Sequence, residues 1–110
     1  MKKKKNSKTK AAMTLAWGFV REAGLPLGEA MHRAYLNIAL DARLRLGQAV
    51  EIAYRKADGT IREAIAVAAR AGQDLVKGTG HGAPDRNYLY FDVGKNEFRC
   101  FCKARLLVVL

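Results

Sequence analysis

The sequence predicts an α+β domain, with two helices in residues 7–47 and five short strands in residues 48–110. In the first part of the chain, apolar residues recur every three or four positions, which is the spacing of a helix with one buried face. From Gln48 onward they alternate with polar residues instead, as in the strands of a half-buried sheet. Asp58-Gly59 supplies a tight turn between the first two strands, because glycine accepts a positive φ without steric cost.

The size and charge of the chain limit the number of domains and the kinds of partner that it can have. A chain of 110 residues is long enough for one domain with its own core. Twenty basic residues against ten acidic ones give a formal net charge of +10, and six of the basic residues are lysines within the first ten positions. The remaining fourteen basic residues and the ten acidic ones leave a net charge of about +4 on the folded part. This charge favours an anionic partner, either nucleic acid or anionic lipid, without choosing between them.

The cysteines and the N-terminal segment predict a cytoplasmic protein without a membrane partner. Cys100 and Cys102 would share one face of a strand and could not easily bond each other, which suits a reducing compartment. The lysine run before residues 11–20 imitates the start of a signal peptide, but charged residues follow at once and no small-residue cleavage site follows closely. The aliphatic run at residues 106–110 is too short to cross a bilayer.

The first helix is expected after a disordered basic leader of residues 1–6, with Ser7 as its N-cap. Gly24 and the following Leu25-Pro26 predict its end, since glycine often follows a helix and proline cannot continue one. Its apolar stripe comprises Ala12, Leu15, Ala16, Phe19, Val20 and Ala23, widened by Met13 and Trp17.

The second helix is expected to begin at Leu27 or Gly28, and it carries two apolar rows. Its main stripe comprises Leu27, Met31, Ala34, Tyr35, Ile38, Ala42 and Leu46. A further row, Leu36, Leu40 and Leu44, lies on roughly the opposite side. Two interpretations stay open: the first helix covers one row and the strands cover the other, or the further row supports self-association into a homo-oligomer.

The strands follow from alternation. Val50, Ile52 and Tyr54 alternate with polar or small residues in the first strand. The segment after the Asp-Gly turn is ambiguous: Thr60 and Glu63 have capping-box spacing and its many alanines favour a helix, whereas its isoleucines and valine alternate as in a strand. The turn favours the strand. Residues 77–87 are expected to form a glycine-rich loop, residues 87–93 and 97–103 a hairpin, residues 103–105 a kink and residues 106–110 the last strand.

Candidate catalytic or metal-ligating residues are few, so we expect no enzyme, no cofactor and no metal site. His32 and His81 lie far apart in the sequence, and neither belongs to a nucleophile motif. Cys100 and Cys102 could be half of a soft-metal site, but His81 is their one obvious further ligand, which favours buried structural thiols. The glycine-rich residues 78–82 lack the flanking elements of a phosphate-binding loop and are better explained as a flexible connection.

The hairpin of residues 87–103 combines aromatic and basic residues that could bind nucleic acid. If Leu89, Phe91 and Val93 face inward, Tyr88 and Tyr90 face outward, and so do the cations and the phenylalanine at alternate positions of the partner strand. Outward aromatic rings could then stack on bases while the cations hold phosphates. In the alternative, the first helix covers this face and the aromatic residues are ordinary core.

Several segments resemble a small bacterial family of Sm-like, SH3-type β-barrels related to WYL domains. They are residues 57–64 (Ala-Asp-Gly-Thr-Ile-Arg-Glu-Ala), 77–80 (Lys-Gly-Thr-Gly), 90–92 (Tyr-Phe-Asp), 98–99 (Phe-Arg) and Leu106, together with residues 12–17 of the leading helix. The resemblance implies a small, five-stranded, SH3-like barrel with a 3₁₀ turn at residues 103–105. The family is of unknown function and occurs largely in bacterial chromosomes, mobile elements and phage. Residues 65–73 depart from it in being richer in alanine.

We therefore expect a non-enzymatic module that binds nucleic acid, RNA or DNA, or that regulates a partner; the relation to WYL domains supports this by analogy alone. The expected binding residues, beside the lysine leader, are Arg55, Arg62, Lys77, Arg86, Tyr88, Tyr90, Arg99, Phe101 and Lys103. The alternative is a protein-interaction or assembly module that uses Leu36, Leu40 and Leu44 or an open barrel edge. A small-ligand sensor with the glycine-rich loop as a lid is a third hypothesis.

Overall fold

The chain folds into two helices followed by five antiparallel strands, which confirms the predicted α+β class. The computed structural model describes residues 5–69, 75 and 86–110, with side chains from Thr9 onward. The elements are α1 (Lys5–Ala23), α2 (Leu27–Arg45), β1 (Val50–Arg55), β2 (Ile61–Ala68), β3 (Asn87–Asp92), β4 (Glu97–Cys102), the 3₁₀ helix η1 (Lys103–Arg105) and β5 (Leu106–Val109).

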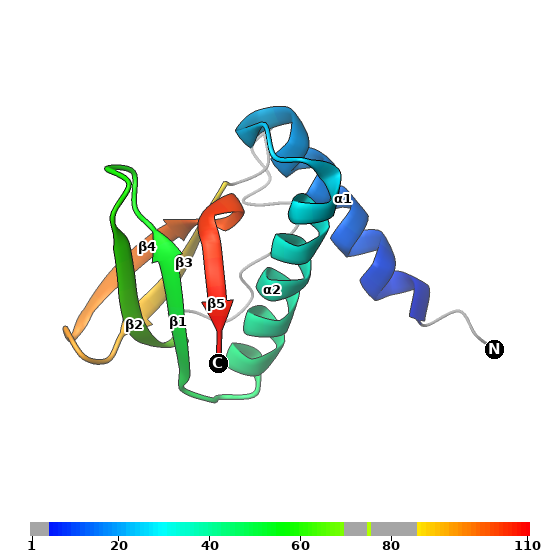
Figure 1. Ribbon diagram of the computed structural model, residues 1–110. Helices are drawn as coiled ribbons and strands as arrows, with labels where there is room; N and C mark the ends of the chain where they lie inside the picture. The colour runs from blue at the N-terminus through cyan, green and yellow to red at the C-terminus, as the bar shows by residue number, and fades with distance from the viewer. Residues whose placement is uncertain (1–4, 70–74, 76–85) are drawn as a thin grey trace.

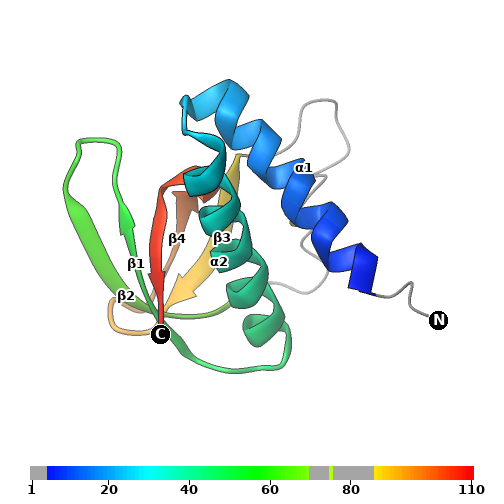
Figure 2. The same cartoon turned by 45° about the vertical axis from the view of Figure 1, so that its right-hand side comes forward.

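The strands form one curved sheet with the order β4-β3-β2-β1-β5. Helix α2 packs against β5, η1, β1 and β2 on one face of this sheet, and α1 packs on α2 from the outside (Figures 1 and 2). Among the described residues, β4 and β5 are the two edges, so the sheet is an open barrel rather than a closed one. The face toward α2 is called the inner face below, and the opposite face the outer face.

Helix α1 begins at Lys5, so the predicted boundary after residue 6, with Ser7 as the cap, is too late by about one turn. Lysine is a good helix former, and neither glycine nor proline interrupts residues 5–17. The predicted end is confirmed: Gly24 has a φ of +71°, and its N–H donates to the carbonyl of Val20 at 3.2 Å. The buried face of α1 consists of Ala12, Leu15, Ala16 and Phe19.

Helix α2 buries only part of the predicted main stripe, in which Ala34 is fully buried and Met31 and Ile38 pack against the core. Tyr35 and Leu46 of that stripe are 40% and 75% exposed. Leu40 and Leu44 are each 1% exposed and belong to the core, with Leu36 packed against it. The hypothesis of self-association through Leu36, Leu40 and Leu44 is therefore wrong. The strands cover this row, because a monomer with α1 on one side of α2 and a sheet on the other uses both apolar rows.

Strand β2 confirms the strand interpretation of residues 61–68. It pairs with β1 on one side and with β3 on the other, so tertiary pairing overrides the helical propensity of its alanines. Ala66 lies on the inner face opposite Val50 and is fully buried. A small residue here lets α2 approach the middle of the sheet.

Polar side chains of α2 fasten the helix to η1. The side-chain amide of Asn37, 1% exposed, donates to the carbonyl oxygens of Lys103 and Arg33, both at 2.8 Å. One turn earlier, the Arg33 guanidinium donates to the carbonyl of Ala104 at 2.7 Å. A 3₁₀ segment leaves main-chain carbonyls without partners in its own turn, and a buried carbonyl without a partner is costly. The helix supplies the missing donors.

Asn37→Asp is expected to destabilise the fold by about 3 kcal/mol or more, because the isosteric carboxylate has no hydrogen to donate and sets a buried negative charge against two carbonyls. The free energy of unfolding, from urea denaturation at neutral pH, measures the loss. His32→Ala, at an exposed position of the same helix, is the control and should change it by no more than about 0.5 kcal/mol. A stability of Asn37→Asp equal to that of the control would contradict the role of this contact.

Candidate nucleic-acid interface

The aromatic residues predicted to stack on bases lie in the core. Tyr88, Tyr90 and Phe101 are 3%, 0% and 2% exposed. Their rings pack together and against Tyr54, with the centroids of Tyr88 and Phe101 5.6 Å apart and those of Tyr54 and Phe101 5.2 Å apart. The predicted outward orientation is wrong, and the core alternative is right. The cover comes from α2 and not from α1 as that alternative had it, because the Tyr88 hydroxyl donates to Asp41 of α2 at 2.5 Å.

The hairpin register puts the other set of side chains outside. Phe91 pairs with Phe98 across β3 and β4, and their rings meet edge to face on the outer face, 5.0 Å apart. Phe98 is 62% exposed and Cys100 is exposed as well, so the expectation of a buried thiol fails at Cys100. Alternation determines which residues share a face, but this hairpin is apolar on both faces, so its pattern does not decide which one points inward.

Burial changes the acid–base behaviour of two tyrosines. Loss of hydration raises the pKa of Tyr88 far above its usual value, and the hydrogen bond to Asp41 raises it further. Burial likewise raises the pKa of Tyr90, whose hydroxyl is 2.8 Å from that of Tyr54 and shares a hydrogen bond with it. Both hydroxyls therefore stay protonated at neutral pH, and they form hydrogen bonds within the core.

Two of the predicted cations are engaged inside the structure. Lys103 is 4% exposed, and its ammonium donates to the carbonyl of Leu75 at 2.7 Å. Arg99 lies opposite Tyr90 and forms ion pairs with the buried Asp92, at 3.3 Å, and with Glu97. Neither side chain is placed to hold a phosphate, so the prediction fails for both.

The other predicted cations are scattered. Arg55 is exposed at the β1–β2 turn, where its guanidinium donates to the carbonyl of Gly59 at 2.6 Å. Arg62 is half-buried on the inner face. Arg86 is exposed beside α1, where it pairs with Glu22 at 3.0 Å. These positions do not form one surface, and Lys77 lies outside the described residues.

Helix α1 presents a basic and aromatic face that the sequence predictions did not single out. Lys10, Met13, Trp17 and Arg21 follow one another at intervals of three, four and four residues, so they share one side of the helix. Met13 is 36% exposed and Trp17 is 43% exposed, and both cations are exposed. We call these four residues the α1 face. The sequence signal was present in the lysine-rich start of the helix, but Met13 and Trp17 were assigned to the buried stripe.

The remaining candidate groups do not converge on a site in the part of the chain that the structure describes. His32 is exposed on α2. Within the described ranges, no three His, Cys, Asp or Glu side chains are grouped so that they could hold a metal ion. His81 and residues 78–82 are outside those ranges. No described helix is long and apolar enough to cross a membrane.

Comparison with known proteins identifies a family for the barrel. The WYL_2 family model, described as an Sm-like SH3 β-barrel fold, matches residues 37–107. The match runs from the middle of α2 through the sheet and η1 into β5, and it leaves out α1. Searches of the curated proteins and of the solved structures found no match.

Stability is expected to fall in alkaline solution because of the two buried tyrosines. Their folded-state pKa values are raised, so their contribution is complete below the pKa of an unfolded tyrosine, about 10, and is lost as the pH rises above it. Urea denaturation at neutral pH and at successive pH values above about 10 measures the loss. Tyr90→Phe should be less stable at neutral pH yet lose less on alkalinisation; an equal alkaline loss in both proteins would contradict this origin.

Proposed function

The chain belongs to the WYL_2 family of Sm-like SH3 β-barrels, and we propose that it is a non-enzymatic module that binds single-stranded nucleic acid through the α1 face. The barrel serves as the scaffold that holds α1 through α2 (Figure 2), and the basic and aromatic side chains of the α1 face are exposed to solvent. The proposal replaces the predicted binding surface on the hairpin and keeps the predicted class of ligand.

The observation that carries the proposal is the exposure of Trp17 between two cations. Trp17 is 43% exposed, and a large aromatic ring with a polar N–H is a side chain that is enriched at binding interfaces. Lys10 and Arg21 lie about two turns before it and one turn after it on the same side of α1. An indole ring with cations on both sides can stack on a base while the cations contact the flanking phosphates.

Charge supports the same surface. Six lysines occur in the first ten residues of the sequence, so positive charge is concentrated along the chain just before Met13 and Trp17. Arg86 adds a cation beside the other end of α1, where it pairs with Glu22 at 3.0 Å. Clustered cations attract a phosphate backbone and release its counterions, which gives affinity without sequence preference. The stacking residue then favours single strands, whose bases are free to leave the stack.

No catalytic step belongs to the proposal. His32 on α2 and Cys100 on β4 lie on different elements, and neither contacts the α1 face through a described interaction. Binding by stacking and phosphate contacts needs no nucleophile, cofactor or metal ion.

Trp17→Ala is expected to weaken binding of an oligothymidine by about 5- to 150-fold, since stacking on one base contributes about 1–3 kcal/mol. Fluorescence anisotropy of the labelled oligonucleotide measures the affinity. Trp17 is the chain's single tryptophan, so quenching of its emission by the unlabelled oligonucleotide reports stacking directly. Arg55→Gln, which neutralises a predicted cation on the barrel instead, is the matched control and should bind as the wild type does.

Salt gives a second test of the same surface. The affinity of the wild type should fall steeply between low and moderate salt, and Lys10→Gln with Arg21→Gln should reduce the slope of log affinity against log salt by about 0.7 per lost phosphate contact. An affinity that does not change with salt concentration would contradict the proposal. So would tryptophan emission that stays unchanged at a saturating concentration of the oligonucleotide.

A further inference from the structure

The outer face of the sheet leaves large apolar side chains in water. Ile65, Val93 and Phe98 are 41%, 47% and 62% exposed. They are neighbours across the strands, because the N–H of Val93 donates to the carbonyl of Ile65 at 2.9 Å and Phe98 packs on Phe91. Ile61, Val108 and Leu110 extend this apolar surface over β2 and β5. Exposed apolar area of this kind, gathered on one face, is typical of a surface that docks a partner.

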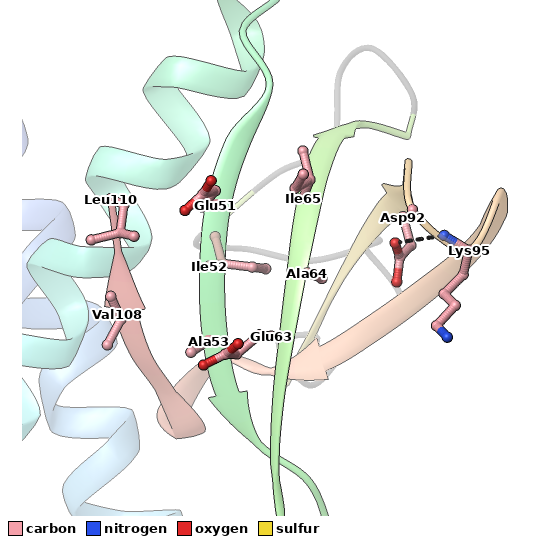
Figure 3. A pocket seen from close by; sticks show the side chains of 11 residues that line it. Glu51, Ile52, Ala53, Glu63, Ala64, Ile65, Asp92, Lys95, Val108 and Leu110 are labelled. Atoms are coloured by element: carbon pink, nitrogen blue, oxygen red, sulfur yellow. Dashed lines mark hydrogen bonds between the residues drawn. The ribbon is translucent and has the colours of Figure 1, made fainter.

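A cleft of about 520 Å³ lies in this surface, over β1, β2 and the end of β5 (Figure 3). Its apolar lining includes Ala53, Ile65, Val108 and Leu110. The β3–β4 turn, with Lys95, borders its far side. Three carboxylates also line the cleft, those of Glu51, Glu63 and Asp92, and the last of these is paired with Arg99.

The carboxylates of Glu51 and Glu63 lie on adjacent strands, and neither has a partner among the described residues. Glu51 is opposite Ile65 and Glu63 opposite Ala53, so the two acids are diagonal neighbours on the outer face. Within the described part of the chain, neither side-chain carboxylate forms an ion pair or a hydrogen bond. The other described acidic residues do have such partners: Glu22, Glu29, Asp41, Asp58, Asp92 and Glu97.

Two unpaired like charges on neighbouring strands repel each other and destabilise the sheet slightly. They persist in a protein with twice as many basic as acidic residues, where a pairing cation would be easy to supply. An incoming cation would relieve this repulsion, while the apolar lining would accept an aliphatic side chain. The cleft is therefore complementary to a ligand that carries both a positive charge and an apolar group.

We propose that this cleft binds an extended basic segment of a partner protein, with a lysine or arginine over Glu51 and Glu63 and a neighbouring apolar side chain against Ile65 and Val108. A second copy packed through the same face would bring four carboxylates together, so a heterologous partner is favoured over a homodimer. A nucleic acid is disfavoured here because the two carboxylates repel phosphate. The site is separate from the α1 face, because helix α1 is separated from the sheet by α2 (Figure 1).

The test begins with selection of random heptapeptides, displayed on phage, on the immobilised full chain. The recovered sequences should be enriched in lysine or arginine placed beside apolar residues. No recovery, or recovery without basic residues, would overturn the proposal. The most enriched peptide is then synthesised with a fluorescent label, and its affinity is measured by anisotropy.

The variants separate this cleft from the rest of the surface. Glu51→Gln with Glu63→Gln should weaken binding of that peptide about three- to tenfold, and Ile65→Ser should weaken it as well. Glu29→Gln removes an exposed acid of α2 and should leave the affinity unchanged. The double glutamine variant should bind oligothymidine as the wild type does, so failure here and failure at the α1 face are distinguishable.

Two results would overturn the proposal at this stage. Equal peptide affinity of the wild type and the double glutamine variant would show that the carboxylates take no part. Sedimentation that reveals a dimer of the wild type, dissociated by Ile65→Ser, would assign the outer face to a second copy of the chain instead.

Discussion

The contact between α2 and η1 is the constraint on which the rest of the structure depends. Asn37 donates to the carbonyl of Lys103 and Arg33 to that of Ala104, so the chain is held against the helix where it passes from β4 into β5. Because both contacts join main-chain carbonyls to buried or half-buried donors, the helix cannot slide without leaving polar groups unsatisfied. This contact fixes α2 against the inner face of the sheet, where the apolar core lies.

That choice of face divides the molecule into a core and two separate surfaces. Tyr88 and Tyr90 lie on the inner face and are buried, so they are not accessible to a ligand. Phe98 and Ile65 lie on the outer face and are exposed to solvent. Helix α1 completes the cover of α2 and leaves its own Trp17 exposed. The two surfaces carry opposite charge, basic on α1 and acidic in the outer cleft, which is why we propose chemically different partners for them.

Much of the fold could be predicted from local patterns, and little of the site could. Val50, Ile52 and Tyr54 point inward as their alternation predicts, and the Asp-Gly turn lies where expected, with Gly59 at a φ of +91°. The binding surface was misjudged at Tyr88 and Lys103 for one reason. Both residue types are common on binding surfaces and, when partnered, also occur in cores, and their partners come from segments distant in the sequence.

By itself, the sequence determined the elements, their order, the turn chemistry, the family and the gathering of positive charge at the N-terminus, because each of these depends on neighbouring residues or on composition. Only the tertiary structure decided which face is buried in the elements that are apolar on two sides. When a helix or hairpin is apolar on two sides, as α2 and β3–β4 are, local free energy hardly distinguishes the two orientations. Packing against elements distant in the sequence then decides, and with it which residues are left to meet a partner.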